Sequence, residues 1–138
     1  MSKKGDEWLT PQWLYDMLNK RFRFTLDPCT TVHNPLNTPR FYTKQDNGLI
    51  QEWRPGPVFM NPPYSEIPKW AAKAWSESRK GVLVVGLLRF DPTTKWWNTY
   101  VKDEACWVWP IPKRLKFRGA ISSYPFPSCI VVWHGLKA

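Results

Sequence analysis

The segment Asn61-Pro62-Pro63-Tyr64 combines residue types that could hold an exocyclic amino group on a planar base. Each proline fixes its own φ and restricts the residue before it, so the turn is stiff. Neither proline has an N–H, so the turn presents carbonyl oxygens and the Asn61 amide, which can accept hydrogen bonds from an NH₂ group. Tyr64 adds a ring on which a base could stack. We therefore interpret this turn as a candidate site for gripping an amino group.

The pattern around this turn predicts strands that alternate with helices, which favours a three-layer α/β fold. Thr10 and Pro11 are expected as the N-cap and first residue of a helix over 12–20, with Trp13, Leu14, Met17 and Leu18 on one face. The apolar run 81–88 is typical of a strand buried on both faces of a parallel sheet. The other expected elements are strands at 22–26, 41–42, 58–60, 105–111 and 128–133, helices at 66–79 and 93–102, a loop at 28–40 and a turn at 46–48.

Two polar residues are expected just past strand ends. Asp27 follows the strand at 22–26, and Asn61 follows the strand at 58–60. Ligands of open α/β sheets bind beyond the carboxyl ends of the strands. We therefore expect Asp27 and Asn61 to contribute to one site.

Composition limits the class of protein. The 138 residues suffice for one domain with one core, and 20 basic against 11 acidic residues give a net charge of +9, which favours nucleic acid as partner. Three cysteines form no CxxC pair and two histidines stand alone, so we expect no metal site, no disulfide framework and a reducing cytosol. No apolar stretch is long enough for a membrane span, and the polar N-terminus is not a signal peptide. Most of the ten tryptophans are expected in the core, with some left to stack on bases.

Four segments occur in the order found in a known family: residues 6–11, 26–29, 47–53 and 61–65. Together they resemble the phage-type DNA adenine methyltransferases, and Arg114-Leu115-Lys116-Phe117 is similar to that family's motif near the target base. The resemblance implies a compact, single-domain, Rossmann-like methyltransferase fold over 1–138, with a mostly parallel sheet, helices on both faces and no separate target-recognition domain. It also implies S-adenosylmethionine as donor and adenine in DNA as acceptor, in the cytoplasm of a bacterial or phage-infected cell. The glycine-rich loop usual after the first strand of such folds is replaced here by Asp27-Pro28-Cys29-Thr30.

The resemblance also implies roles for individual residues. The side-chain oxygen of Asn61 and the backbone carbonyl of Pro62 would grip the adenine amino group, and Tyr64 would stack on the flipped base. The residues expected to contact the cofactor are Trp8, Thr10, Pro11, Asp27, Pro28, Cys29 and, as a second carboxylate, Asp46. The residues expected to contact DNA are Lys113, Arg114, Lys116 and Arg118 on phosphates and Phe117 near the flipped base.

Other interpretations stay open from the residues alone. The same chemistry could act on another amino acceptor, such as cytosine, RNA adenine or a glutamine side chain. The chain could also be a non-enzymatic, Trp-rich module that binds nucleic acid, and residues 113–118 could be a solvated edge strand. His33 and His134 are expected to be surface groups. We expect a monomer or a weak homodimer.

Overall fold

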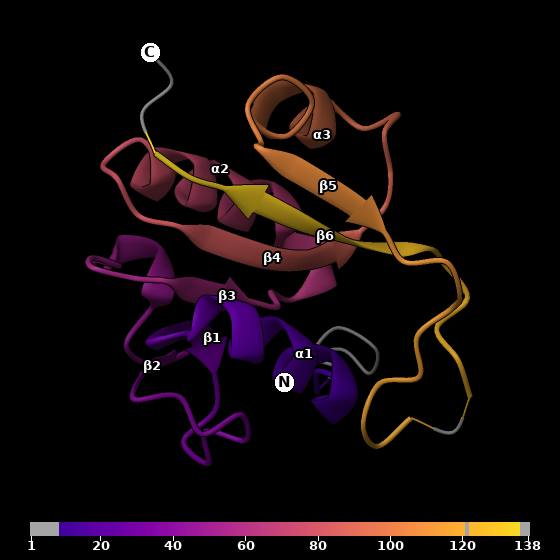
Figure 1. The fold of residues 1–138 in the computed structure, drawn as a ribbon, viewed down its shortest axis with the longest axis horizontal. Coiled ribbons are helices and arrows are strands. Elements are labelled where there is room, and N and C mark those ends of the chain that lie inside the picture. Colours follow the sequence, from indigo (N-terminus) through magenta and orange to yellow (C-terminus); the bar gives the residue numbers. More distant parts are fainter. Residues whose placement is uncertain (1–8, 121, 136–138) are drawn as a thin grey trace.

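The fold is built on a six-stranded sheet with the strand order β2-β1-β3-β4-β6-β5. This description rests on a computed structural model and covers residues 9–120 and 122–135. Figure 1 shows the strands running side by side across the molecule. The strands are β1 (Leu26–Thr30), β2 (Arg40–Thr43), β3 (Val58–Met60), β4 (Val84–Arg89), β5 (Trp107–Pro110) and β6 (Ser128–Trp133).

The sheet is parallel in one half and antiparallel in the other. β1 pairs in parallel with β2 and β3, and β3 pairs in parallel with β4. β6 is antiparallel to both of its neighbours, β4 and β5. Three of the five pairings are therefore parallel, so the carboxyl ends of β1, β2, β3 and β4 meet at one edge of the sheet.

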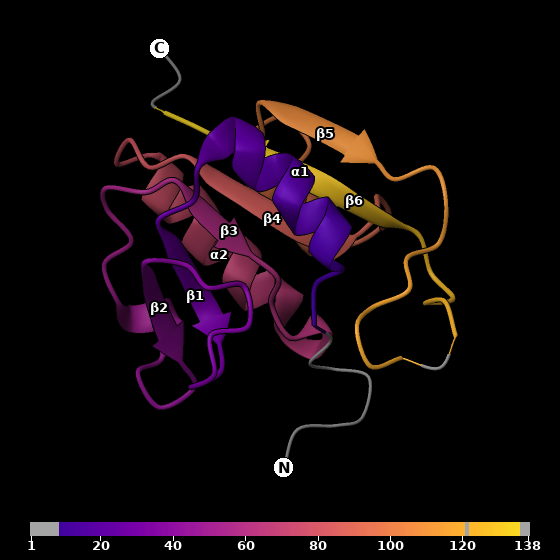
Figure 2. The ribbon, with the colours of Figure 1, turned by 60° about the horizontal axis from the view of Figure 1, so that its bottom comes forward.

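Helices cover both faces of the sheet (Figures 1 and 2). α1 (Gln12–Phe22) lies on one face, where its Leu14 and Leu18 join a buried cluster with Phe59 of β3. α2 (Ile67–Ser78) and α3 (Lys95–Tyr100) lie on the other face and share a second buried cluster. None of the helices in the described part of the chain is long and apolar enough to cross a membrane.

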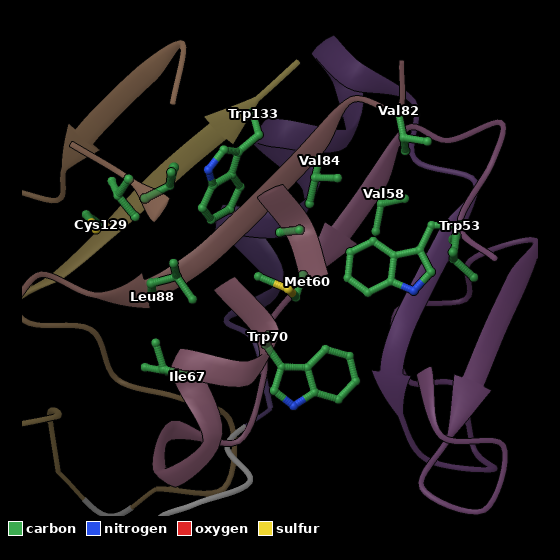
Figure 3. Close-up of a cluster of buried hydrophobic side chains, with 14 of the residues drawn as sticks. Trp53, Val58, Met60, Ile67, Trp70, Val82, Val84, Leu88, Cys129 and Trp133 are labelled. Atoms are coloured by element: carbon green, nitrogen blue, oxygen red, sulfur yellow. The ribbon is translucent and has the colours of Figure 1, made fainter. Parts of the chain in front are cut away.

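The second cluster contains four fully or nearly buried indoles, those of Trp53, Trp70, Trp97 and Trp133. Figure 3 labels three of them, Trp53, Trp70 and Trp133. Trp53 and Trp70 stack with their ring centroids 6.3 Å apart, and Trp133 lies on β6. Trp53 is also tied to α2, because its backbone N–H donates to the buried Glu77 carboxylate at 2.9 Å. Two lysines complete this carboxylate site, with Lys73 Nζ 3.3 Å and Lys80 Nζ 2.8 Å from Glu77 Oε2. A buried carboxylate is tolerated here because it is fully paired.

The predicted start of the first helix is wrong. Pro11, not Thr10, is the N-cap residue, and no side chain caps the helix. The predicted apolar face is also rotated, because Leu14, Tyr15 and Leu18 are buried whereas Trp13 and Met17 stay about half exposed. The helix ends later than predicted, at Phe22, where Arg23 adopts a left-handed conformation with φ 57°.

The predicted strand at 22–26 is displaced, because the observed strand β1 begins at Leu26 and runs through Asp27 and Pro28. The Asp-Pro pair predicts a strand end, since proline cannot donate a hydrogen bond to a ladder. Here the pairing of β1 with β2 changes register between Asp27 and Thr30, so Pro28 sits at an irregularity where the ladder tolerates the missing donor.

The loop predicted at 28–40 is shorter than expected, because residues 28–30 belong to β1 and Arg40 begins β2. The other predicted strands and helices form with shifted bounds. The strands at 41–42, 58–60 and 128–133 and the helix at 66–79 correspond to β2, β3, β6 and α2. The strand predicted at 81–88 is β4, whose residues Val84 to Leu88 are all buried. The turn expected at 46–48 leads into η1 (Gly48–Ile50), and a further short helix, η2 (Tyr64–Glu66), precedes α2.

Candidate active site

A cavity of about 510 Å³ opens at the carboxyl ends of β1 and β3. The pairing of Leu26 with Val58 sets these two parallel strands in register, so counting three residues along each places Cys29 level with Asn61. The topology therefore brings together the two sequence segments that were expected to share a site. The lining residues are Leu9, Thr10, Asp27, Pro28, Cys29, Thr30, Thr31, Val32, Pro35, Leu36, Thr43, Lys44, Gln45, Asn61, Pro63, Glu66, Trp70 and Arg118.

Thr10 orients the amide of Asn61 across the cavity wall. Asn61 Nδ2 donates to Thr10 Oγ1 at 3.0 Å, and Thr10 is buried at 3% exposure. Because Nδ2 is engaged by a hydroxyl acceptor, the carbonyl end of the amide is turned away from Thr10. The side chain that the sequence pattern assigned to a helix cap thus serves instead to orient Asn61.

Asp27 is a buried carboxyl group on the cavity wall. Its side chain is 4% exposed, and Oδ1 accepts a hydrogen bond from the Cys29 backbone N–H at 3.3 Å. No ion pair to Asp27 occurs among the described residues. Burial raises the pKa of Asp27 from its ordinary value of 3.8 to about 7, even though the hydrogen bonds from Cys29 and Thr30 oppose the rise. The cavity therefore holds an acceptor whose ionised form lacks a cationic partner.

Cys29 lies on the cavity wall next to Asp27 and the Asn61 turn. Burial and the neighbouring Asp27 carboxylate raise the pKa of the Cys29 thiol well above its ordinary value, although the backbone N–H of Asn61 opposes the rise. Cys29 is therefore a neutral thiol at physiological pH, not a nucleophilic thiolate. Its place in the site is that of a small, weakly polar wall residue.

The segment 47–53 supports this wall from behind. A Cβ atom at Gly48 would overlap the backbone carbonyl of Pro28, so only glycine allows this approach. The Gly48 carbonyl in turn accepts a hydrogen bond from Trp53 Nε1 at 2.9 Å. This part of the expected motif does not line the cavity. Its contacts hold Pro28, and with it Asp27, in place.

Known proteins resemble this chain over most of its length. A family model described as DNA N-6-adenine-methyltransferase (Dam) matches residues 1–133. The chain belongs to this family. A DNA N-6-adenine-methyltransferase of Haemophilus phage HP1 is 33% identical over 121 residues, which are 84% of this chain and 69% of that protein. A DNA N-6-adenine-methyltransferase of Escherichia phage T1 is 27% identical over 106 residues, which are 75% of this chain and 44% of that protein.

Membership in the Dam family confirms the predicted resemblance and makes the chain an enzyme of the adenine-specific DNA methyltransferase class. It decides against the interpretation as a non-enzymatic binding module.

Tyr64 of this Dam-family chain does not line the cavity but packs in an aromatic cluster. Its ring meets Tyr124 at a centroid distance of 5.2 Å and Phe117 at 6.1 Å, both in edge-on geometry. Tyr124 in turn contacts Phe126, over whose ring Arg89 lies at 3.7 Å. The hydroxyl of Tyr64 is buried beside the buried hydroxyl of Ser128. The structure thus joins Tyr64 and Phe117, two residues expected near the target base, in one cluster beside the Asn61 turn.

Residues 113–118 form no regular strand, although their side chains alternate as predicted. Lys113, Arg114 and Lys116 are exposed, whereas Leu115 and Phe117 are buried. Within the described part of the chain, this segment takes part in one isolated antiparallel bridge, between Leu9 and Arg118. The edge-strand interpretation is therefore wrong, because the segment crosses the end of the sheet and extends none of its edges.

Arg118 differs from the basic residues before it. It is half-buried, lines the cavity, and donates from Nε to the Thr10 carbonyl at 3.0 Å. The sequence pattern placed it with the DNA-facing cations, but its side chain belongs to the cavity wall.

Some of the other expected site residues line the cavity and others do not. Pro63 lines the cavity, whereas Pro62 is buried behind it. Asp46 is exposed and does not line the cavity, because its carboxylate closes a turn by accepting hydrogen bonds from the Thr43 N–H at 2.8 Å and the Thr43 hydroxyl at 3.1 Å. Pro11 is the N-cap of α1, and Trp8 lies outside the described residues.

The histidines and the possible metal ligands are the last of the expected features. His33 and His134 are exposed, as predicted. The described residues contain no group of three or more side chains that could hold a metal ion.

Sequence reasoning missed Glu66 and Trp70 as cavity residues. Both follow the Asn61 turn, and Trp70 Nε1 donates to Glu66 Oε1 at 3.4 Å. The available signal was their position, because the start of a helix that directly follows the Asn61 turn lies at the same edge of the sheet as that turn. Thr43 and Lys44 follow the same logic at the end of β2.

Proposed function

We propose that this enzyme transfers a methyl group from S-adenosylmethionine to the exocyclic amino nitrogen of adenine in DNA, using a Rossmann-like methyltransferase domain. The observation that carries the proposal is the shared cavity. Thr10, Asp27, Cys29 and Asn61 come from three separate segments and line one space at the carboxyl ends of parallel strands. In such sheets this is where nucleotide-like ligands bind.

The residues present fit the donor. Asp27 supplies a buried acceptor that lacks a cation, and a donor's ammonium group or ribose hydroxyls would satisfy it. Pro28, Cys29 and Trp70 supply apolar wall. S-adenosylmethionine, when bound, provides an electrophilic methyl group on a sulfonium. Because displacement at this methyl needs no protein nucleophile, the neutral Cys29 thiol is consistent with the reaction.

The chain's own contribution is to activate and place the acceptor nitrogen. The amino lone pair of adenine is delocalised into the ring. We propose that the Asn61 side-chain oxygen and the Pro62 carbonyl accept hydrogen bonds from the amino group and so favour a tetrahedral nitrogen whose lone pair is available. The hydrogen bond from Asn61 to Thr10 supports this role, because it holds the amide in one orientation before substrate binds.

The target adenine must leave the duplex to reach Asn61, which costs a few kcal/mol. Stacking on an aromatic ring returns about 1–3 kcal/mol per base. We propose that Tyr64 and Phe117 provide this surface when the aromatic cluster opens to admit the base. We propose that Lys113, Arg114 and Lys116 contact phosphates of the DNA. Their exposure and the net charge of +9 support this role.

The direct test is to incubate the protein with DNA and labelled S-adenosylmethionine and to analyse the nucleosides by mass. We expect N6-methyl-2′-deoxyadenosine as the product. Methylated cytosine would refute the proposed acceptor, and no transfer to any DNA would refute the proposed activity. RNA of matched sequence serves as the control for the acceptor polymer. Light scattering at assay concentrations would test the expectation of a monomer or weak homodimer.

A further inference from the structure

Among the residues that the structure describes, two ionisable groups on the cavity wall have no partner of opposite charge. Asp27 is the first, as described above. Arg118 is the second: no ion pair to it occurs among the described residues, and its Nη2 is buried without any hydrogen-bond partner. Burying a charged group is unfavourable unless it is paired. A cavity that offers a buried carboxyl group for a cation and a guanidinium group for an anion matches a ligand that carries both charges.

The position of Arg118 is set by the chain itself. Its backbone N–H donates to the Leu9 carbonyl at 3.0 Å, and its Nε donates to the Thr10 carbonyl at 3.0 Å. Thr10 is also the residue that orients Asn61. The guanidinium is therefore anchored at one edge, which leaves the rest of its planar fork to bind an anion, and guanidinium forks match carboxylate geometry.

We infer that Arg118 binds the carboxylate of the methyl donor's amino-acid portion, while Asp27 binds its ammonium group. This inference rests on the proposed function and deepens it, because it assigns the two charged ends of the donor to two residues. A phosphate of the target nucleotide offers similar anionic oxygens. The carboxylate is favoured because Arg118 lines the same cavity as Asp27, whereas Lys113, Arg114 and Lys116 are exposed at the surface.

The inference gives Arg118 a positioning role. Thr10 links Arg118 to Asn61 through its carbonyl and its hydroxyl. Arg118, which would bind the carboxylate of the donor, is thus connected through Thr10 to Asn61, which would bind the acceptor amino group. This connection would fix the donor relative to the amino group of the base.

The test compares two ligands by calorimetry in the absence of DNA: S-adenosylmethionine and its decarboxylated form. We expect the wild-type protein to prefer the carboxylated ligand by about tenfold or more, as a charge-assisted hydrogen bond implies. Arg118→Met keeps the length of the stem but removes the charge, and should bind the two ligands about equally. Lys95→Met, which removes an exposed cation of α3 outside the cavity, should keep the wild-type preference.

Binding of the decarboxylated ligand also reports whether Arg118→Met folds, because its affinity should not change. A variant that loses affinity for both ligands in parallel would overturn the inference in favour of a structural role. If Arg118→Met still prefers the carboxylated ligand, the inference is also overturned. If that variant then shows a weaker salt dependence of DNA binding than wild type, Arg118 contacts a phosphate of the DNA. If the wild-type protein binds neither ligand, the proposed function itself fails, which is a distinct result.

Discussion

The buried carboxyl of Asp27 should destabilise the ligand-free protein at neutral pH. Its pKa is about 7 in the folded protein, against an ordinary value of 3.8. The folded state therefore holds a proton that the unfolded chain releases, and stability falls as the pH rises from about 4 to 7. One pH unit corresponds to about 1.4 kcal/mol, so the full loss is about 4 kcal/mol. Above pH 7 the loss stays constant.

Asp27→Asn isolates this effect, because an asparagine oxygen can still accept from the Cys29 N–H. Urea unfolding of both proteins between pH 4 and 8 should give similar free energies of unfolding near pH 4. The variant should then become more stable than wild type by about 2–4 kcal/mol at pH 7 and above. Asp46→Asn makes the same change at an exposed carboxylate and controls for the loss of one negative charge from a basic chain. A difference that does not vary with pH would refute the reasoning.

The same ionisation should govern donor binding. Below pH 7 the free protein carries a protonated Asp27, which is a poor partner for an ammonium group. The affinity for S-adenosylmethionine should therefore decrease as the pH falls from 7 towards 5, with proton release on binding in that range. Asp27→Asn should bind S-adenosylmethionine weakly and with an affinity that does not depend on pH in this range. Asp27 would then stabilise the complex with the donor although it destabilises the free protein.

Further predictions concern the residues around the cavity. Gly48→Ala should force the Pro28 carbonyl to move, which lowers stability by about 1–3 kcal/mol and weakens donor binding; an unchanged melting temperature would contradict this. Asn61→Ala should reduce methyl transfer by about 100-fold or more with the fold intact, and near-wild-type turnover would mean that the turn is only structural. Tyr64→Phe removes a buried hydroxyl whose neighbour is the Ser128 hydroxyl, so calorimetric stability should change by no more than about 1 kcal/mol while much of the activity remains. Glu77→Gln should destabilise by about 1–3 kcal/mol. Burial alone would raise the pKa of Glu77, but hydrogen bonds from Lys80 and Trp53 outweigh it and lower the pKa. The ionised Glu77 therefore stabilises the fold, and the difference in free energy of unfolding between wild type and variant should be present above pH 4.5 and disappear on acidification.

Signals that depend on neighbours along the chain were interpreted correctly from the sequence. The apolar run before Asn61 forms β3, and the helical spacing after it forms α2. The continuous apolar run at 81–88 becomes the buried strand β4. Alternation of basic and apolar residues at 113–118 correctly separated exposed from buried side chains, although no strand forms there. In each of these cases the pattern of burial follows from backbone geometry and side-chain type alone.

The tertiary structure decided what each polar side chain does. Thr10 has the residue type and place of a helix cap, but its hydroxyl accepts from Asn61, 51 positions away in the chain. Arg118 has the spacing of a DNA-facing cation, but its anchor on Thr10 turns it to the cavity wall. Glu77 sits on the buried side of α2 because Trp53, Lys73 and Lys80 converge on it. A polar side chain can form hydrogen bonds with several partners, and the partner it contacts depends on which distant segments the sheet brings beside it. The sequence alone therefore identified the candidate residues. Their contacts were decided by the folded chain.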